Sequence, residues 1–225
     1  TTTSQSNPWK SDTNKSNEKA FAAIREDGSV VAWGNAGFGG DLGAKASLLD
    51  GSEGNKAVAI YEGSRAFAAV KEDGSVVTRG QFNTGGSHTE DSSENWSGQW
   101  GASGNVAAPE GSLESGVSKL FSNAYSFAAL KNDGSVVAWG DSAANNPAGN
   151  TSSVASSLTG GVKTICSNRY AFAALKNDGS VVTWGNQSYG GNSSSVASSL
   201  TGIKSIFATN WAFAALTSNN QVVAW

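Results

Sequence analysis

Residues 171–186 read AFAALKNDGSVVTWGN, and the chain contains five copies of this pattern, which decide the fold. The other copies read AFAAIREDGSVVAWGN from Ala20, AFAAVKEDGSVVTRGQ from Ala66, SFAALKNDGSVVAWGD from Ser126 and AFAALTSNNQVVAW from Ala212. Their anchoring phenylalanines stand 46, 60, 45 and 41 residues apart, at Phe21, Phe67, Phe127, Phe172 and Phe213. A period of this size is typical of proteins built from repeated supersecondary units.

Each copy holds two short apolar runs separated by a tight turn. In four copies the turn contains Asp-Gly, at Asp27-Gly28, Asp73-Gly74, Asp133-Gly134 and Asp178-Gly179. Glycine supplies the positive φ that a bulged hairpin needs, and aspartate caps the turn. Asn219-Asn220 replaces the pair in the last copy, and asparagine also tolerates left-handed geometry. A further apolar run precedes the last four copies, at 58–61, 117–121, 162–166 and 203–207, which predicts at least three strands per repeat.

The hairpin strands are apolar or neutral on both faces, as in 172–175 and 181–184. Such a strand belongs to a sheet that is covered on both sides. Small sheets stacked face to face around an axis provide this cover, so the sequence predicts an all-β fold, a β-propeller with one blade per repeat. The alternative is a linear stack of the same sheets, which needs capping repeats at both ends, and no distinctive cap is present.

The copies, together with the run before them, resemble the regulator of chromosome condensation (RCC1-like) repeat family in its bacterial, short-repeat form. The resemblance rests on Gly161-Val162-Lys163-Thr164-Ile165 and on 174–185, ALKNDGSVVTWG, and extends from Ala20 to Trp225. It implies a propeller whose blades have about four strands, the fourth lying after the Trp-Gly pair. Family propellers commonly have seven blades, so the five copies form either a closed five-bladed ring or part of a larger propeller.

The repeats also divide the chain. Residues 1–19 are polar and irregular and are expected to form an N-terminal segment, which completes a blade by strand pairing if the ring closes with five blades, while 20–225 form the propeller. An insertion at 81–116 accounts for the 60-residue spacing. Because the chain starts with Thr1, contains no Met and stops at Trp225 before the expected Gly, we expect it to be a fragment of a longer protein.

Composition excludes several functions. No segment approaches the roughly 18 consecutive apolar residues of a membrane span, so membrane insertion is not expected. The net charge is −3, and the 15 Lys and Arg form no basic block, so nucleic acid is not an expected partner. The lone Cys166 forms no internal disulfide, and His88 beside Glu90, Asp91 and Glu94 lacks the ligand set of a zinc site. We therefore expect no metal, no cofactor and no enzymatic activity.

Because successive strands of a blade alternate in direction, one ring of side chains is expected on a single face of the propeller. The turn between the first two strands of each repeat and the loop leaving the third emerge on the same side, opposite the Asp-Gly hairpins. The residue two before each anchoring phenylalanine lies in that turn, which gives the ring Lys19, Arg65, Tyr125, Tyr170 and Trp211. Such side chains suit partner recognition. The alternative is that the aromatic members pack against neighbouring turns.

The insertion is the second candidate for partner binding. It leaves from the face of the ring and carries Trp96 and Trp100 among acidic and small residues. Long loops of compact domains are usually functional or disordered, so it is either a recognition loop or a solvated insertion pinned by its tryptophans. Arg79 stands where other copies have Trp, and Trp96 or Trp100 is expected to fill the gap.

The leading functional hypothesis is a non-enzymatic binding or adhesion module of a larger exported or cell-surface protein that recognises a protein or a glycan. The near-neutral charge, the missing disulfide and the many Ser, Asn and Gly are compatible with export from a bacterium-like source. One alternative is a structural, self-assembling repeat protein that pairs through an open blade edge. Another, implied by the resemblance, is an inhibitor of an extracellular enzyme. No residue argues for the exchange-factor activity of the family.

Overall fold

The computed structural model describes residues 17–81, 84–85, 105–106, 108–143 and 147–225. They form five antiparallel sheets, one for each repeat. We name them blades 1 to 5. In chain order they comprise β1 (Ala20–Ile24) and β2 (Val30–Gly34); β3 (Ala57–Glu62), β4 (Ala66–Lys71) and β5 (Val76–Gly80); β6 (Asn105–Val106), β7 (Val117–Ser122), β8 (Ser126–Lys131) and β9 (Val136–Asp141); β10 (Val162–Ser167), β11 (Ala171–Lys176) and β12 (Val181–Gly185); and β13 (Ile203–Ala208), β14 (Phe213–Thr217) and β15 (Val222–Ala224).

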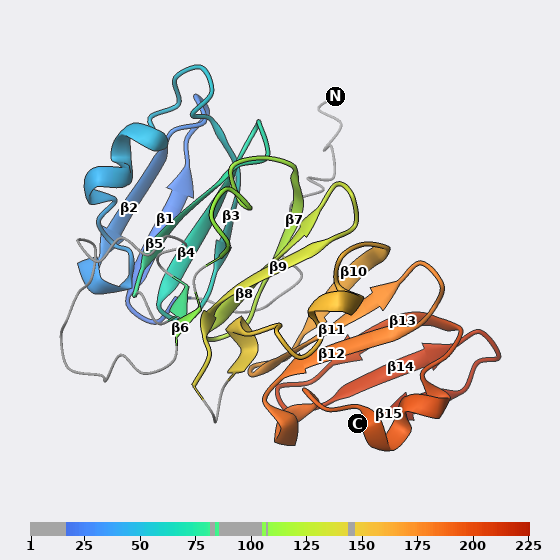
Figure 1. The fold of residues 1–225 in the computed structure, drawn as a ribbon. Helices are drawn as coiled ribbons and strands as arrows, with labels where there is room; N and C mark the ends of the chain where they lie inside the picture. The colour runs from blue at the N-terminus through green and yellow to red at the C-terminus, as the bar shows by residue number, and fades with distance from the viewer. Residues whose placement is uncertain (1–16, 82–83, 86–104, 107, 144–146) are drawn as a thin grey trace, which may run out of the picture.

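The blades follow one another along an arc, from the blue blade 1 to the red blade 5 (Figure 1). The first strands β3, β7, β10 and β13 contact one another in sequence, and β1 contacts β3. The three-stranded repeat predicted from sequence is confirmed in blades 2 to 5, while blade 1 has only β1 and β2 among the described residues.

The fourth strand is not where the resemblance implied. Among the described residues only blade 3 has one, β6, which comes from the insertion before the blade and pairs antiparallel with β9. The tracts after strand three instead form short 3₁₀ helices: η1 (Ala36–Phe38), η2 (Gly43–Leu48), η5 (Pro147–Gly149), η6 (Ala155–Ser157), η7 (Gln187–Tyr189) and η8 (Ser194–Ser199). Gly39 and Gly190 end two of them with φ of 93° and 87°, which turns the chain away from an extended path.

The predicted hairpin turn is present in detail. Gly179 has φ of 80°, and the backbone N–H of Lys176 donates to the Ser180 carbonyl at 2.9 Å. Asp178 accepts hydrogen bonds from the backbone N–H and the hydroxyl of Ser180, at 2.9 and 2.6 Å. These bonds, the hydroxyl first, lower the pKa of Asp178. Asn220 has φ of 63°, so asparagine takes the left-handed position in the last copy, as predicted.

An aromatic pair joins each of blades 3, 4 and 5 to the blade before it. Phe172 and Trp184 lie opposite each other on β11 and β12, and their rings stack at 5.2 Å between centroids. The Trp184 indole N–H donates to the Ala148 carbonyl in the loop after blade 3, at 3.1 Å. Trp139 and Trp225 make the same bond to the loops after blades 2 and 4, at 3.2 and 3.0 Å. The pair is thus both the core of its blade and the link to the preceding one.

Arg79 makes this link in blade 2. It lies opposite Phe67 in the register of β4 and β5, and its Nε donates to the Asp41 carbonyl of the loop after blade 1, at 2.8 Å. A guanidinium group therefore bridges the two blades where the other blades use an indole. Trp96 and Trp100, which we expected to fill this gap, lie outside the described residues, so that expectation stays a prediction.

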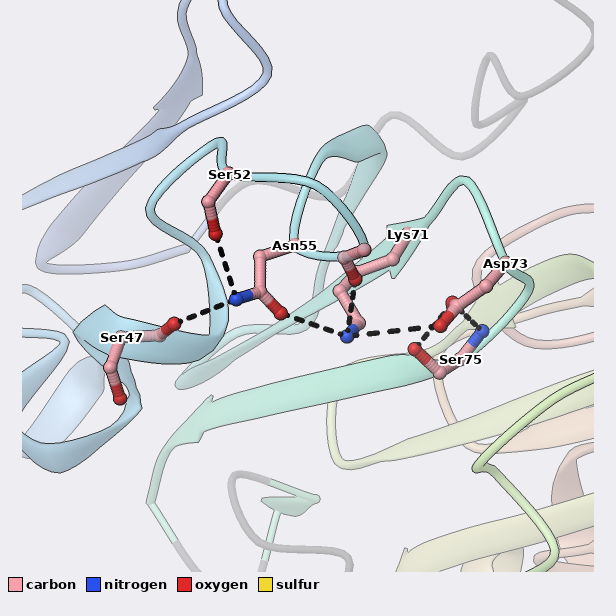
Figure 2. A network of polar contacts seen from close by, with 7 residues as sticks. Ser47, Ser52, Asn55, Lys71, Asp73 and Ser75 are labelled. Carbon is pink, nitrogen blue, oxygen red and sulfur yellow. Dashed lines mark hydrogen bonds and ion pairs between the residues drawn. The ribbon is translucent and has the colours of Figure 1, made fainter.

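Lysines at the end of the second strand fasten the loops between blades. Figure 2 shows Lys71, whose Nζ donates to the Gly54 carbonyl at 3.0 Å and to Asn55 Oδ1 at 3.4 Å, with Asp73 3.9 Å away. Asn55 in turn donates to the Ser47 carbonyl and Ser52 Oγ. The corresponding Lys131 and Lys176 also donate to loop carbonyls. The long loops are therefore held against the blades by ammonium groups.

Among the described residues, no blade covers the two ends of the arc. Phe21 and Trp33 of blade 1 are 61% and 51% exposed, whereas their counterparts Phe172 and Trp184 are 0% and 2% exposed. Phe207 of blade 5 is 59% exposed, although its counterpart Phe121 is buried. Blades 1 and 5 therefore do not cover each other, and the five blades form an open arc. In the described part of the chain, no helix is long and apolar enough to cross a membrane.

The glycine after each tryptophan gives a test of the fold. Gly185 has φ of 111°, and a Cβ there would lie 2.7 Å from the Tyr170 carbonyl oxygen. Gly185→Ala should lower the free energy of unfolding by at least about 1 kcal/mol in urea titrations followed by tryptophan fluorescence. Gly160→Ala is the control, because its nearest contact is 3.7 Å away, and it should stay within about 0.5 kcal/mol of the parent. Equal losses in the two variants would contradict this role.

Candidate functional site

A chain of backbone hydrogen bonds lines up the first turns of all five blades. The residue three before each anchoring phenylalanine donates its N–H to the carbonyl of the corresponding residue in the next blade. The bonds run Glu18 to Ser64, Ser64 to Ala124, Ala124 to Arg169 and Arg169 to Asn210, at 2.8, 3.1, 3.3 and 3.3 Å. The predicted ring residues follow these positions directly in sequence. The structure therefore places the five turns side by side on one face.

A buried asparagine fixes each ring residue in blades 1, 3 and 4. In blade 4, Asn168 Oδ1 accepts from the backbone N–H groups of Tyr170 and Ala171, both at 2.8 Å. Its Nδ2 donates to the Tyr189 carbonyl at 2.6 Å, which ties the turn to the loop after β12. Asn17 makes the same link to the Phe38 carbonyl at 2.8 Å. Asparagine suits this position because its side chain mimics a backbone turn.

Four aromatic side chains from blades 3 to 5 form what we call the aromatic row: Tyr125, Tyr170, Tyr189 and Trp211. Tyr170 lies at its centre, with ring centroids 5.7 Å from Tyr125, 5.0 Å from Tyr189 and 5.6 Å from Trp211. The three pairs are stacked within 29° of parallel. Such offset stacks stabilise each pair by about 1 kcal/mol beyond burial. The three tyrosines are half-buried, and Trp211 is 50% exposed.

Arg169 adds a positive charge to the aromatic row. Its guanidinium carbon lies 5.6 Å from the centroid of the Tyr170 ring, and its side chain is exposed. A side-chain hydrogen bond with Tyr125 is the main cause that raises the pKa of Arg169, while burial is the main cause that raises the pKa of Tyr170. Both shifts keep the arginine charged and the tyrosine neutral. The surface therefore offers hydroxyl groups, aromatic edges and a fixed cation.

Lys19 and Arg65 belong to a separate, cationic sector of the ring. Their charged groups lie 5.1 and 5.7 Å from the centroid of Phe38, which is the counterpart of Tyr189 in blade 1. Glu18 forms an ion pair with Arg65 at 3.5 Å. The five predicted residues thus lie on one face but split into two groups, one around Phe38 and one around Tyr170. Trp96 and Trp100, also predicted to bind a partner, lie outside the described residues.

Tyr189 and Arg169 were missed by the sequence reasoning. Tyr189 could have been found from the sequence, because 188–191 (SYGG) aligns with 37–40 (GFGG). Both segments lie in the loop that leaves the third strand, and the alternation of strand direction places this loop on the face of the ring. Arg169 stands directly before a ring residue, but the corresponding positions hold Glu18, Ser64, Ala124 and Asn210. A position that differs in every copy carries no repeat signal, so only the structure assigns it to the row.

Metal-ligating side chains do not gather in the described part of the chain. No group of three or more His, Cys, Asp or Glu in them could hold a metal ion. Cys166 forms no disulfide among the described residues, and its half-buried side chain packs beside the cluster of Ala171, Ala173 and Phe213. It lies on β10. What the face can do chemically is bind, through stacking, hydrogen bonds and charge.

Three solved structures are similar to this chain over 93% of its length. Prp20p from Saccharomyces cerevisiae superposes with a TM-score of 0.58 at 19% identity, over 56% of its own length. Yeast RCC1 (Prp20), solved bound to Kap60, superposes with a TM-score of 0.54 at 18% identity, over 54% of its length. Human WBSCR16 superposes with a TM-score of 0.53 at 17% identity, over 60% of its length. The chain therefore spans little more than half of these structures, and the likeness shows the fold, which confirms the predicted propeller architecture. No family model and no curated protein sequence matches the chain.

Two matched asparagines test how the row is held. Asn168 and Asn123 are both buried and cap their turns alike, but within the described residues Asn123 Nδ2 has no hydrogen-bond partner. Asn168→Ala should therefore lower the free energy of unfolding by about 1 kcal/mol more than Asn123→Ala, because only the former breaks the bond to Tyr189. Chemical denaturation of the two variants measures this difference. A larger loss for Asn123→Ala would rule out the link as the support of the row.

Proposed function

We propose that this chain, which has the fold of an RCC1-like β-propeller, is a binding module that recognises a protein partner through the aromatic row and Arg169. The observation that carries the proposal is the stacking of Tyr125, Tyr170 and Trp211 from three successive blades on one face. The similar Prp20p structure is described with its binding to Gsp1p and histones, and yeast RCC1 with Kap60 bound. These neighbours support protein recognition as a use of the fold.

The physical case rests on rigidity and on residue type. Tyr, Trp and Arg supply most of the energetically important contacts in protein interfaces. The turn-to-turn hydrogen bonds and the Asn168 cap hold the row in place before a partner arrives, so little side-chain entropy remains to be lost on binding. The stacked faces of the row are occupied by one another, which leaves ring edges, hydroxyl groups and the Arg169 guanidinium for a partner.

More specific roles, namely adhesion, enzyme inhibition and glycan binding, would use the same aromatic row. An adhesion role in an exported or cell-surface protein, or inhibition of an extracellular enzyme, would use the same rigid face, and the Ser-, Asn- and Gly-rich composition suits the first. A glycan is the alternative ligand, because aromatic side chains with adjacent hydroxyl groups also suit sugars. An export signal in the full gene would support the first hypothesis, and its absence would remove it.

Peptide selection tests the aromatic row directly. A phage-displayed peptide library is selected on the immobilised chain, and the enriched peptides are measured by calorimetry against Tyr170→Ala/Trp211→Ala. We expect at least a tenfold loss of affinity, about 1.4 kcal/mol, because two central anchors are gone. Asn132→Ala/Asn177→Ala, on the opposite hairpins, should bind like the parent.

Two results would contradict the proposal. Equal affinity of the selected peptides for the parent and for Tyr170→Ala/Trp211→Ala would remove the row as the site. A glycan array run in parallel addresses the ligand class: sugars bound by the parent and lost in the same variant, with no enriched peptide, would assign the row to glycans instead.

Self-assembly is a second candidate that one observation favours, the exposure of both end faces. In the joint between blades 3 and 4, Phe121 packs in one cluster with Phe172 and Trp184. Blade 5 offers the counterpart of Phe121, Phe207, and blade 1 offers the stacked pair Phe21 and Trp33 at 5.6 Å. The end of one copy thus matches the beginning of another, and such a head-to-tail contact builds chains rather than closed pairs.

Mixing two variants tests this candidate. Trp33→Glu damages only the blade 1 face and Phe207→Glu only the blade 5 face, so each alone should be monomeric in analytical ultracentrifugation, while the parent grows with concentration. An equal mixture retains one intact joint and should stop at the dimer. Asn132→Glu in the central blade 3 is the charge control and should assemble like the parent. A parent that stays monomeric at every concentration would refute head-to-tail assembly.

A further inference from the structure

We propose that the outer edge of β12 in blade 4 is a strand-addition site, which binds an extended segment of a partner protein as an extra antiparallel strand. The site is distinct from the aromatic row: it lies along the third strand of the blade, whereas the row is formed by the first turns and the exit loop. A bound segment would have alternating apolar and small polar residues, without proline at the paired positions.

The hydrogen-bonding register shows which groups face outward. The N–H of Lys176 donates to the Ser180 carbonyl, and the N–H of Asn186 donates to the Tyr170 carbonyl, so 180, 182, 184 and 186 bond toward β11. The N–H and carbonyl groups of Val181 and Thr183 point the other way. Neither of these N–H groups has a hydrogen-bond partner in the described part of the chain.

Blade 4 differs here from the three blades before it. In those blades the first outward N–H, from Val30, Val76 or Val136, donates to the carbonyl of a leucine in the following loop, at 2.8 to 2.9 Å. The corresponding bond at Val181 is absent among the described residues. The edge also lacks the charge that would discourage pairing, because 181–185 reads VVTWG.

A cavity of about 580 Å³ runs beside this edge. All five residues of β12 line it, with one wall from the loop after blade 3 and the other from the loop after blade 4. The first wall includes Val154, which packs against the cluster of Trp184. The second includes Ser193, whose hydroxyl lies 3.1 Å from the Thr183 hydroxyl. Because side chains of a strand alternate between faces, an added strand would present its side chains in turn to a mixed wall, where Val154 lies among serines, and to a polar wall.

Blade 3 shows that such an edge accepts a strand. There β6 pairs antiparallel with β9, with Asn105 opposite Asp141 and Val106 opposite Gly140. Gly140 corresponds to Gly185 in the repeat, so β6 occupies on blade 3 the edge that is open on blade 4. Strand addition to an open edge gains affinity from backbone hydrogen bonds and selectivity from the alternating side-chain contacts. The occupant is therefore an extended peptide segment that resembles β6.

The probe is a synthetic peptide with the sequence of 101–108, GASGNVAA, and its partner control carries proline in place of the valine. Amide hydrogen exchange of the full chain is followed by NMR with and without peptide. In the register of β6 the peptide lies opposite Gly185 and Thr183, whose N–H groups both face outward, so we expect at least tenfold slower exchange at these two residues. The proline peptide should leave both rates unchanged. Unchanged rates with GASGNVAA at about 1 mM would overturn the proposal, since the affinity would then be negligible.

A pair of variants separates edge pairing from side-chain contact. Thr183→Pro removes one outward N–H and leaves the bonds to β11 in place, so peptide affinity should fall at least tenfold. Thr183→Val keeps that N–H and should bind within about twofold of the parent. If the Pro variant does not fold, the Val variant alone tests the proposal, because the peptide must then protect its Gly185 amide from exchange. Peptide binding by Thr183→Pro at parental strength would overturn the site.

Discussion

The structure depends on one constraint: no blade can bury its own aromatic pair. Phe172 and Trp184 are covered by blade 3, whose Phe121 packs in their cluster and whose following loop accepts the indole hydrogen bond at Ala148. The same arrangement recurs at Trp139 and Trp225. A sheet that is apolar on both faces is stable only between neighbours, so stability belongs to the joints between blades rather than to single blades. Exposed aromatic side chains at the two ends of the arc follow directly from this.

The joints also explain why a surface of variable residues is held so firmly. Backbone hydrogen bonds link the first turns, from Glu18 through to Asn210, and these bonds do not depend on which side chains the turns carry. The buried Asn168 fixes the direction of the chain, and the residue two positions later is free to vary. The repeat can therefore carry lysine and arginine in blades 1 and 2 and aromatic residues in blades 3 to 5 without loss of the scaffold.

The sequence predicted what recurs and missed what does not. The strands, the Asp178-Gly179 turn and the common face of the ring follow from residues found in nearly every copy. Arg79 could not be understood in this way, because its bond to the Asp41 carbonyl depends on a loop from another blade. The 3₁₀ helices after strand three were missed for a related reason: their Ser- and Ala-rich sequences have no strong local preference, and glycines in left-handed geometry set their path.

Exposure does not mean the same thing at every aromatic residue of the row. Trp211 is 50% exposed, but it lies in the last blade, where Phe207 and Val222 are exposed as well, so the missing neighbour contributes to its exposure. Tyr125 and Tyr170 lie in blades that have a neighbour on each side, and they remain partly exposed nonetheless. A covering blade would not bury these two tyrosines. They, with Arg169 beside them, are therefore the part of the row whose accessibility is a property of the face itself and not of the open end.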